Sequence, residues 1–239
     1  MKPLIWAHRG ASAYAPENTL PAFMLAEQMH AHAVELDVHL SRDGEVVVAH
    51  DEAVDRVANG TGWIVEKTLC ELKTLSFNRT HPDIAATLPT LQEVLAFLQG
   101  TQMGVNIELK TNVFLYEGIE EKVVALVDQY GMRSRTIYSS FNHYSLMNLR
   151  QVDPHARIGL LYECGIVDPW QYANQLCANA IHPDYRALQA PGVVQACEAH
   201  GVAVHPWTVD DPDSMRALAH LGVHAVITNK PDLAHQVLD

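Results

Sequence analysis

Short apolar runs alternate with longer stretches of helical pattern along most of the chain. The apolar runs have the length of strands, and the stretches between them have the spacing of amphipathic helices. Strands are predicted over residues 3–8, 33–38, 45–50, 104–109, 136–140, 157–162, 179–183, 202–207 and 224–228. Helices are predicted over residues 19–32, 90–99, 116–130, 143–151, 168–177, 189–200 and 211–221. Because strands that alternate with helices form βαβ units, the pattern predicts a parallel sheet.

The connection between the second and third runs, Ser-Arg-Asp-Gly at 41–44, is too short for parallel strands. An Asp-Gly pair is a hairpin signal, so the third run is predicted as the returning arm of a hairpin. Eight parallel strands then remain, which is the number in a TIM (β/α)8 barrel, and a doubly wound open sheet is the alternative. Residues 51–88 show little strand pattern. We predict a small insertion there, after the second strand, in a single domain of residues 1–239.

Composition and charge narrow the possible functions. The 239 residues are 48% hydrophobic, and 16 basic residues against 28 acidic ones give a net charge of −12. Binding to nucleic acid or to an anionic membrane needs clustered basic residues, so we expect neither partner. A small phosphorylated substrate needs only a local positive pocket. No apolar run reaches the roughly 18 residues of a membrane span.

The first residues and the cysteines bear on location. Residues 1–10 have one early charge, few apolar positions and no cleavage-site pattern, so we expect no signal peptide and a cytoplasmic protein. Four widely spaced cysteines without a CxxC pair are typical of free thiols in the cytosol. The sequence does not indicate whether the chain forms a homo-oligomer.

Polar residues gather where the early strands are predicted to end. In a parallel barrel the active site lies at the C-terminal ends of the strands. Glu35 and Asp37 are two apart and face the same side of one strand, and Glu108 stands at the end of another. Three buried carboxylates repel one another, and an all-oxygen set of this kind suits Mg²⁺ or Ca²⁺. The alternative is a set of ordinary salt bridges at the barrel rim.

The hairpin predicts a further member of this cluster. A two-residue turn at 43–44 makes Arg42 face Glu45, so that Asp37 lies opposite His50. His50 then lies on the carboxylate face, beside the predicted metal. A shift of one residue in the register would turn His50 away from it.

His8, Arg9 and Lys110 add a second histidine and two cations to the same strand ends. Arginine and lysine bind phosphate, and two histidines supply a general acid and a general base, so the set fits phosphoryl chemistry with a divalent metal. No GxGxxG follows a strand, which argues against hydride transfer to a dinucleotide. No GxSxG elbow is present, which argues against serine hydrolysis.

These motifs together resemble the glycerophosphodiester phosphodiesterase family, in its short, soluble bacterial form. The segments AHRG…PENT, ELDV…DGEVVVAHD, IELK, SSF and WTV occur in the order and spacing of that family, from His8 to about Pro231. The resemblance implies a TIM barrel with a small insertion after the second strand. It also implies metal-dependent hydrolysis of a glycerophosphodiester to sn-glycerol 3-phosphate and an alcohol.

The resemblance further implies a role for each residue that matches a family motif. The general acid and base match His8 and His50, the metal ligands match Glu35, Asp37 and Glu108, and the phosphate contacts match Arg9 and Lys110. Glu17 is expected to brace Arg9 or His8 on the substrate side, with Asn18 and Thr19 starting the first helix. Phe141 and Trp207 match positions on the alcohol or glycerol side of the pocket.

Two departures from the family pattern bear on substrate choice. This chain has Asp210 where the family often has Asn, and Asn229 where it often has Asp, both expected on the glycerol or leaving-group side. Two alternative functions stay open. One is a phosphodiesterase for lysophospholipids, with an apolar groove formed by Trp63, Phe77 and Trp170, and the other is a non-catalytic barrel that binds phosphorylated ligands. The nucleophile is either water or the glycerol 2-hydroxyl.

Overall fold

The computed structural model describes residues 2–239 and consists mainly of one nearly closed barrel of parallel strands. Its strands are β1 (Leu4–His8), β2 (Ala33–Leu40), β3 (Val46–Val48), β4 (Gly104–Leu109), β5 (Thr136–Ser140), β6 (Ile158–Tyr162), β7 (Ala180–Pro183), β8 (Ala203–Val204) and β9 (Ala225–Thr228). All except β3 are parallel, in the spatial order β8-β7-β6-β5-β4-β2-β1-β9.

Backbone hydrogen bonds bring the two ends of this order together. The His224 N–H donates to the Val204 carbonyl at 3.0 Å, and the Ile227 N–H donates to the Pro206 carbonyl at 3.0 Å. β9 therefore lies beside both β1 and the segment that follows β8. The predicted (β/α)8 barrel with an insertion after its second strand is confirmed, and an open sheet is excluded.

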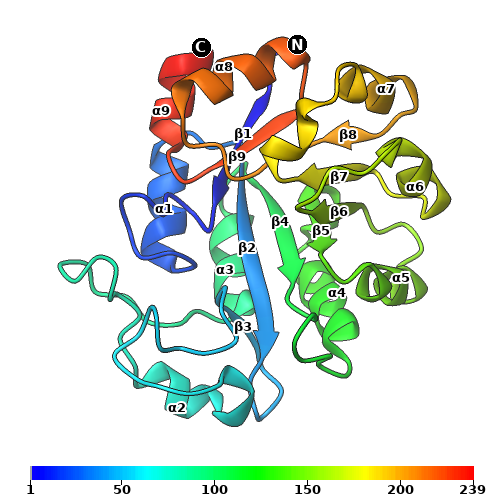
Figure 1. Cartoon of the computed structure of the whole chain (residues 1–239). Coiled ribbons are helices and arrows are strands. Elements are labelled where there is room, and N and C mark those ends of the chain that lie inside the picture. The colour runs from blue at the N-terminus through cyan, green and yellow to red at the C-terminus, as the bar shows by residue number, and fades with distance from the viewer. Residues whose placement is uncertain (1) are drawn as a thin grey trace.

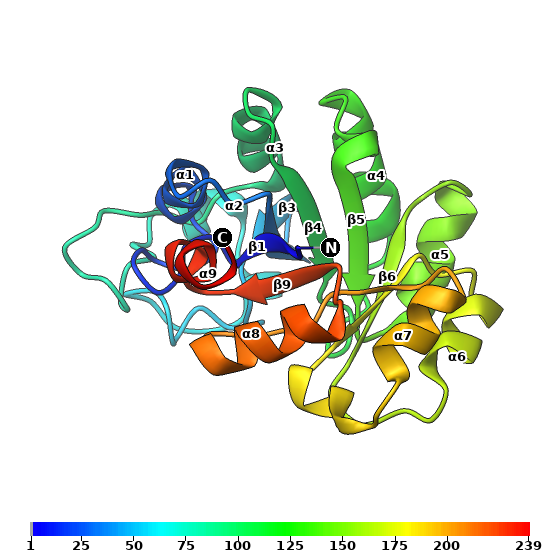
Figure 2. The ribbon, with the colours of Figure 1, turned by 90° about the horizontal axis from the view of Figure 1, so that it is seen from above.

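Helices surround the barrel, and one short helix lies in the insertion at its end (Figures 1 and 2). They are α1 (Leu20–Gln28), α2 (Leu69–Lys73), α3 (Leu91–Gln99), α4 (Ile119–Gln129), α5 (His143–Val152), α6 (Pro169–Gln175), α7 (Val193–Ala199), α8 (Pro212–Leu221) and α9 (Pro231–Leu238). Neither α2 nor α9 is among the predicted helices: α2 has only five residues, and α9 follows the last predicted strand. α1 ends earlier than predicted because His30 adopts a left-handed conformation, with φ 59°.

The strands are buried on both faces. The larger apolar cluster fills the space between barrel and helices, and it includes Phe23, Leu36, Leu95 and Ile107. A smaller cluster inside the barrel holds Trp6, Ala33, Ile137, Ala180, Ala225 and Ile227. β2 is buried at every position, although its interior face carries Glu35 and Asp37. Buried charge on an otherwise apolar strand marks the part of the barrel interior that is not ordinary core.

The hairpin between β2 and β3 has a different register from the predicted one. Val38 pairs with Val48 and Leu40 with Val46, which leaves a three-residue loop at 42–44 instead of a two-residue turn. Gly44, at φ 81°, closes this loop by donating its N–H to the Ser41 carbonyl. A type I′ turn needs positive φ at both central residues, and in 43–44 only the glycine has it. The predicted pairing was therefore wrong by one residue.

Residues 51–88 add no strand to the barrel and carry α2 and a 3-10 helix, Ile64–Glu66. Their apolar side chains form a small cluster with β3, which includes Val47, Ile64, Leu72 and Phe77. Figure 1 shows this insertion, in cyan, at the end of the barrel toward which β2 points, away from both chain termini. The insertion therefore lies at the end where the active site of a parallel barrel is found. No helix within residues 2–239 has the length and apolar character to cross a membrane.

Candidate active site

Three carboxylates meet inside the barrel at the C-terminal ends of β2 and β4. Asp37 pairs with Glu108 in the parallel register, and Glu35 lies two residues before Asp37 on the same strand face. One oxygen of each of the three lies within 4.8 Å of the others. All three side chains are buried, and Asp37 is only 1% exposed. The register alone thus brings together the three predicted metal ligands.

The three carboxyl groups do not share one protonation state. Burial, followed by repulsion from Asp37, raises the pKa of Glu108 to about 7 and that of Glu35 well above its ordinary range. Burial also acts against the ionisation of Asp37. Nearby His50, Lys110 and Arg9 outweigh it and hold the pKa of Asp37 below its ordinary value. A divalent cation would remove the repulsion that keeps the two glutamates from ionising.

The hydrogen bonds of the three carboxylates leave one buried oxygen without a partner. Asn18 donates to Asp37 Oδ2 at 2.8 Å, the Arg9 N–H donates to Glu35 Oε2 at 2.9 Å, and Lys110 Nζ donates to Glu108 Oε1 at 2.9 Å. Asp37 Oδ1 is buried and has no hydrogen-bond partner. A buried carboxylate oxygen without a hydrogen bond is costly, so the residues fit an oxygen-bound Mg²⁺ or Ca²⁺.

The two predicted phosphate contacts lie beside this cluster. Lys110 Nζ is 3.8 Å from Asp37 Oδ1, and Arg9 Nε is 3.6 Å from Asp37 Oδ2. Burial opposes the charge on Lys110, but Glu108 and Asp37 raise its pKa above the ordinary value, so it stays protonated. Gly10 explains the HRG motif. At φ 83° it turns the chain sharply after Arg9, and a Cβ there would lie 2.7 Å from the Ala22 backbone in α1.

His8 is held by an amide. Its Nδ1 lies 2.7 Å from Asn229 Oδ1, which also accepts from Ser12 Oγ, while Asn229 Nδ2 donates to Asp210 Oδ2. Since Asp210 can only accept from Nδ2, Asn229 presents its oxygen to His8. His8 therefore carries its proton on Nδ1 and leaves Nε2 unprotonated, 3.9 Å from Glu35 Oε2. Burial, followed by the charge of Arg9, lowers the pKa of His8 to about 4.

The two departures from the family pattern, Asp210 and Asn229, lie behind His8, a position that the sequence did not predict. Asp210 and Asn229 were expected on the glycerol or leaving-group side of the pocket. Neither residue lines the cavity: Asn229 contacts the His8 imidazole directly, and Asp210 holds the Asn229 side chain. The signal was weak because the two positions are 19 residues apart and lie on either side of α8.

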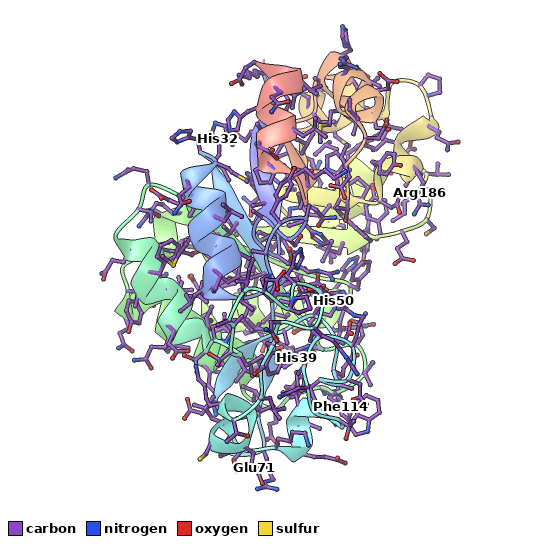
Figure 3. The ribbon with its side chains drawn as sticks, turned by 90° about the vertical axis from the view of Figure 1, so that its left-hand side faces the viewer. His32, His39, His50, Glu71, Phe114 and Arg186 are labelled. Atoms are coloured by element: carbon purple, nitrogen blue, oxygen red, sulfur yellow. The ribbon has the colours of Figure 1, made fainter. Side chains whose placement is uncertain are left out.

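His50 is held by a carboxylate at its side chain and by a histidine at its backbone carbonyl. Its Nδ1 lies 2.7 Å from Asp51 Oδ1, and its carbonyl accepts from His39 Nε2 at 3.2 Å. The hydrogen bond from His50, with help from Arg56, lowers the pKa of Asp51 below its ordinary value, so Asp51 is ionised. Figure 3 labels both side chains, of which His39 belongs to β2 and His50 to the segment that leads into the insertion. His39 also contacts the Tyr116 hydroxyl at 3.0 Å.

The register argument that led to His50 is wrong, although His50 does line the same cavity as His8 and Glu35. Ala49, not His50, lies opposite Asp37 and donates its N–H to the Asp37 carbonyl at 3.1 Å. β3 ends at Val48, and beyond it the chain no longer alternates between faces. His50 therefore reaches the cavity from an irregular segment, which a strand register could not predict.

One cavity of about 600 Å³ joins these groups. Its lining consists of His8, Arg9, Glu35, His50, Asn106, Glu108, Lys110, Asn112, Phe141, Leu161, Glu163, Trp207 and Ile227. Phe141 and Trp207 meet edge to face with ring centroids 5.6 Å apart, on the apolar side. Sequence reasoning missed Asn106, Asn112, Leu161 and Glu163, because isolated residues on loops and interior faces carry no motif.

Several other predicted residues lie elsewhere. Glu17 does not line the cavity but accepts from Arg9 Nη1 at 3.0 Å, as a brace. Asn18 contacts Asp37 rather than capping α1, and Thr19 is the N-cap without a side-chain cap bond. Of the residues suggested for a lipid groove, Phe77 is buried in the insertion, and neither Trp63 nor Trp170 lines the cavity.

The whole chain is similar to known proteins of one family. The Glycerophosphoryl diester phosphodiesterase family matches residues 8–233. A "Glycerophosphodiester phosphodiesterase" of Caldanaerobacter subterraneus subsp. tengcongensis is 43% identical over 97% of this chain and 96% of its own length. One of Bacillus subtilis is 35% identical over 97% of this chain and 85% of its own length.

Solved structures give the same result. A phosphodiesterase of Oleispira antarctica, in complex with the product sn-glycerol-3-phosphate, superposes with a TM-score of 0.90 at 30% identity and covers 100% of this chain and 97% of its own. A glycerophosphodiester phosphodiesterase of Agrobacterium tumefaciens has a TM-score of 0.86 at 33% identity, over 98% of this chain and 100% of its own.

Proposed function

Because the chain belongs to the glycerophosphoryl diester phosphodiesterase family, we propose that it hydrolyses glycerophosphodiesters to sn-glycerol 3-phosphate and an alcohol. The observation that carries this proposal is the cavity in which Glu35 and Glu108, two members of the carboxylate cluster, lie together with two cations and two histidines. These are the groups that phosphodiester hydrolysis requires: a charge clamp, an acid and a base.

Glu35, Asp37 and Glu108 would hold one divalent cation, Mg²⁺ or Ca²⁺, of which the buried free oxygen of Asp37 is the main support. When bound, such an ion polarises the phosphoryl oxygen and offsets charge that builds up there. Arg9 and Lys110 neutralise the other oxygens of the phosphodiester. Both cations are fixed by carboxylates and so need no rearrangement during the reaction.

The two histidines have hydrogen bonds that suit opposite roles. His8 is neutral, with a free Nε2, and can take the proton of the nucleophile. His50 donates from Nδ1 to the ionised Asp51, which orients its ring, and its Nε2 is the group that would protonate the leaving alkoxide. Attack by the glycerol 2-hydroxyl would form a cyclic phosphate first, and ³¹P NMR of the reaction distinguishes this from attack by water.

One comparison tests the proposal. Purified protein is incubated with Mg²⁺ or Ca²⁺ and either glycerophosphocholine or lysophosphatidylcholine, and glycerol 3-phosphate and choline are measured. We expect release of glycerol 3-phosphate from glycerophosphocholine, abolished by EDTA. Turnover of the lysophospholipid alone would support the lipid-directed alternative. Binding without turnover of either compound would support a non-catalytic barrel.

A further inference from the structure

One arginine of the insertion, Arg56, connects the two sides of the catalytic cavity. Its Nη1 and Nη2 each donate to a separate oxygen of Glu17 at 2.7 Å, and its Nε and Nη2 donate to Asp51 at 2.7 and 3.2 Å. The guanidinium thus makes a bidentate interaction with each of the two carboxylates. A planar guanidinium with five donors is the side chain that can do this.

Each of these carboxylates also holds a residue of the cavity. Glu17 Oε1, which accepts from Arg56, also accepts from Arg9 Nη1 at 3.0 Å. Asp51 Oδ1 accepts from Arg56 and from His50 Nδ1 at 2.7 Å. One continuous chain of hydrogen bonds therefore runs from Arg9 through Glu17, Arg56 and Asp51 to His50.

The surroundings of Arg56 argue against a simple packing role. Its side chain is 44% exposed, whereas that of Glu17 is 14% exposed and that of Arg9 is 18% exposed. Exposed ion pairs contribute only about 0–1 kcal/mol to stability. Arg56 itself does not line the cavity, so it acts on substrate only through the two carboxylates.

We propose that Arg56 is a positioning residue, which sets the orientation of the Arg9 guanidinium and of the His50 imidazole together. The proposal rests on the function proposed above. It assigns to the insertion a part in the reaction, because the insertion supplies both Arg56 and Asp51 to this chain of hydrogen bonds. The two sets of hydrogen bonds have separate kinetic consequences. Those that reach Arg9 through Glu17 affect phosphate binding, and those that reach His50 through Asp51 affect proton transfer.

The experiment measures kcat and KM for glycerophosphocholine in Arg56→Met, Glu17→Gln, Asp51→Asn and the two double variants with Arg56→Met. We expect Glu17→Gln mainly to raise KM, Asp51→Asn mainly to lower kcat, and Arg56→Met to do both, with kcat lower by about 10-fold or more. Because the groups form one chain, the kcat of Arg56→Met with Asp51→Asn should equal that of Asp51→Asn alone within about twofold.

Arg42→Met is the matched control. Arg42 also ties the insertion to the barrel, through Glu71 at 3.1 Å and the Glu66 carbonyl at 3.0 Å, but it is 55% exposed and remote from the cavity. It should leave kcat and KM unchanged. Thermal unfolding of every variant shows whether Arg56→Met acts only on stability. Arg56→Lys keeps the charge without the two bidentate interactions, and it should retain the fold and lose activity to an intermediate degree.

The possible outcomes distinguish a failure of the proposed hydrolysis from a failure of the positioning role of Arg56. If wild type does not hydrolyse glycerophosphodiesters, the proposed function fails. If wild type is active and Arg56→Met and Arg56→Lys keep both kinetic constants within twofold, the positioning role is overturned. Independent, multiplicative effects of Arg56→Met and Asp51→Asn on kcat would overturn it too. If Arg56→Met does not fold, Arg56→Lys alone decides the matter by the same criterion.

Discussion

At the scale of the residue, two histidines of one cavity differ because their Nδ1 partners differ. The His8 side chain donates to an amide oxygen and is 15% exposed, while that of His50 donates to a carboxylate and is 31% exposed. The amide and the burial of its ring leave His8 neutral and unprotonated at Nε2, and the carboxylate fixes the orientation of the His50 ring. The base and acid roles proposed above therefore rest on the neighbours of each histidine and not on the residue type.

Both histidines are expected to be needed, but for different steps. His8→Ala and His50→Ala should each lower kcat for glycerophosphocholine by about 10² or more. With a p-nitrophenyl leaving group, which needs no protonation, His50→Ala should recover most of its activity and His8→Ala should not. Steady-state rates on the two substrates provide the measurement, with the exposed His220→Ala as control. Equal recovery of both variants would contradict the assignment.

Asp210 is expected to affect kcat although it does not line the cavity. It accepts from the Asn229 side chain and thereby makes Asn229 present an oxygen to His8. In Asp210→Asn the Asn229 amide is free to turn, and His8 loses its required tautomer, so kcat should fall by about 10-fold, less than in His8→Ala. KM should change little. A large rise of KM with constant kcat would instead place Asp210 on the glycerol or leaving-group side, as first expected.

At the scale of the element, the strand register brings the carboxylates together and loops add the rest. β2 and β4 supply Glu35, Asp37 and Glu108 by pairing in parallel. Such contacts are predictable, because side chains alternate strictly along a strand. His50 and Arg56 come from irregular chain beyond β3, where no period applies, and their positions could not be derived from spacing.

The barrel interior is also closely packed where β6 and β7 lie side by side. Gly159 of β6 faces His182 of β7, and a Cβ on Gly159 would lie 2.3 Å from His182 Nε2. His182 cannot easily move, since His205 lies 3.0 Å from the same nitrogen. Gly159→Ala should therefore destabilise the fold by about 1–3 kcal/mol. Thermal unfolding should show a lowered Tm, whereas Gly165→Ala, where a Cβ meets no atom within 4 Å, should leave Tm unchanged.

At the scale of the whole molecule, stability should depend on pH and metal together. The folded state raises the pKa of Glu108 from 4.5 to about 7 and that of Glu35 in the same direction. Between these values the folded protein holds protons that the unfolded chain has lost. The contribution of these groups to the stability of the metal-free protein is therefore largest below pH 4.5 and falls as the pH rises toward 7.

The corresponding test is thermal unfolding in EDTA and in Mg²⁺ or Ca²⁺, at pH 5.5 and pH 8. The ion needs ionised carboxylates, so it should raise Tm more at pH 8 than at pH 5.5. Glu108→Gln should lose most of the metal effect at both values. An unchanged Tm with either ion at pH 8 would argue against a cation at this site.

The sequence by itself determined the barrel, because the alternation of buried strands with helices repeats regularly, and it determined the carboxylate trio, because strand spacing carries it. Only the tertiary structure decided the register of the hairpin, since a three-residue loop and a two-residue turn share the same Asp-Gly signal. It also decided the partners of His8, His50 and Arg9. Those hydrogen bonds join loops far apart in the chain, where contact is set by how the strands close and not by any local pattern.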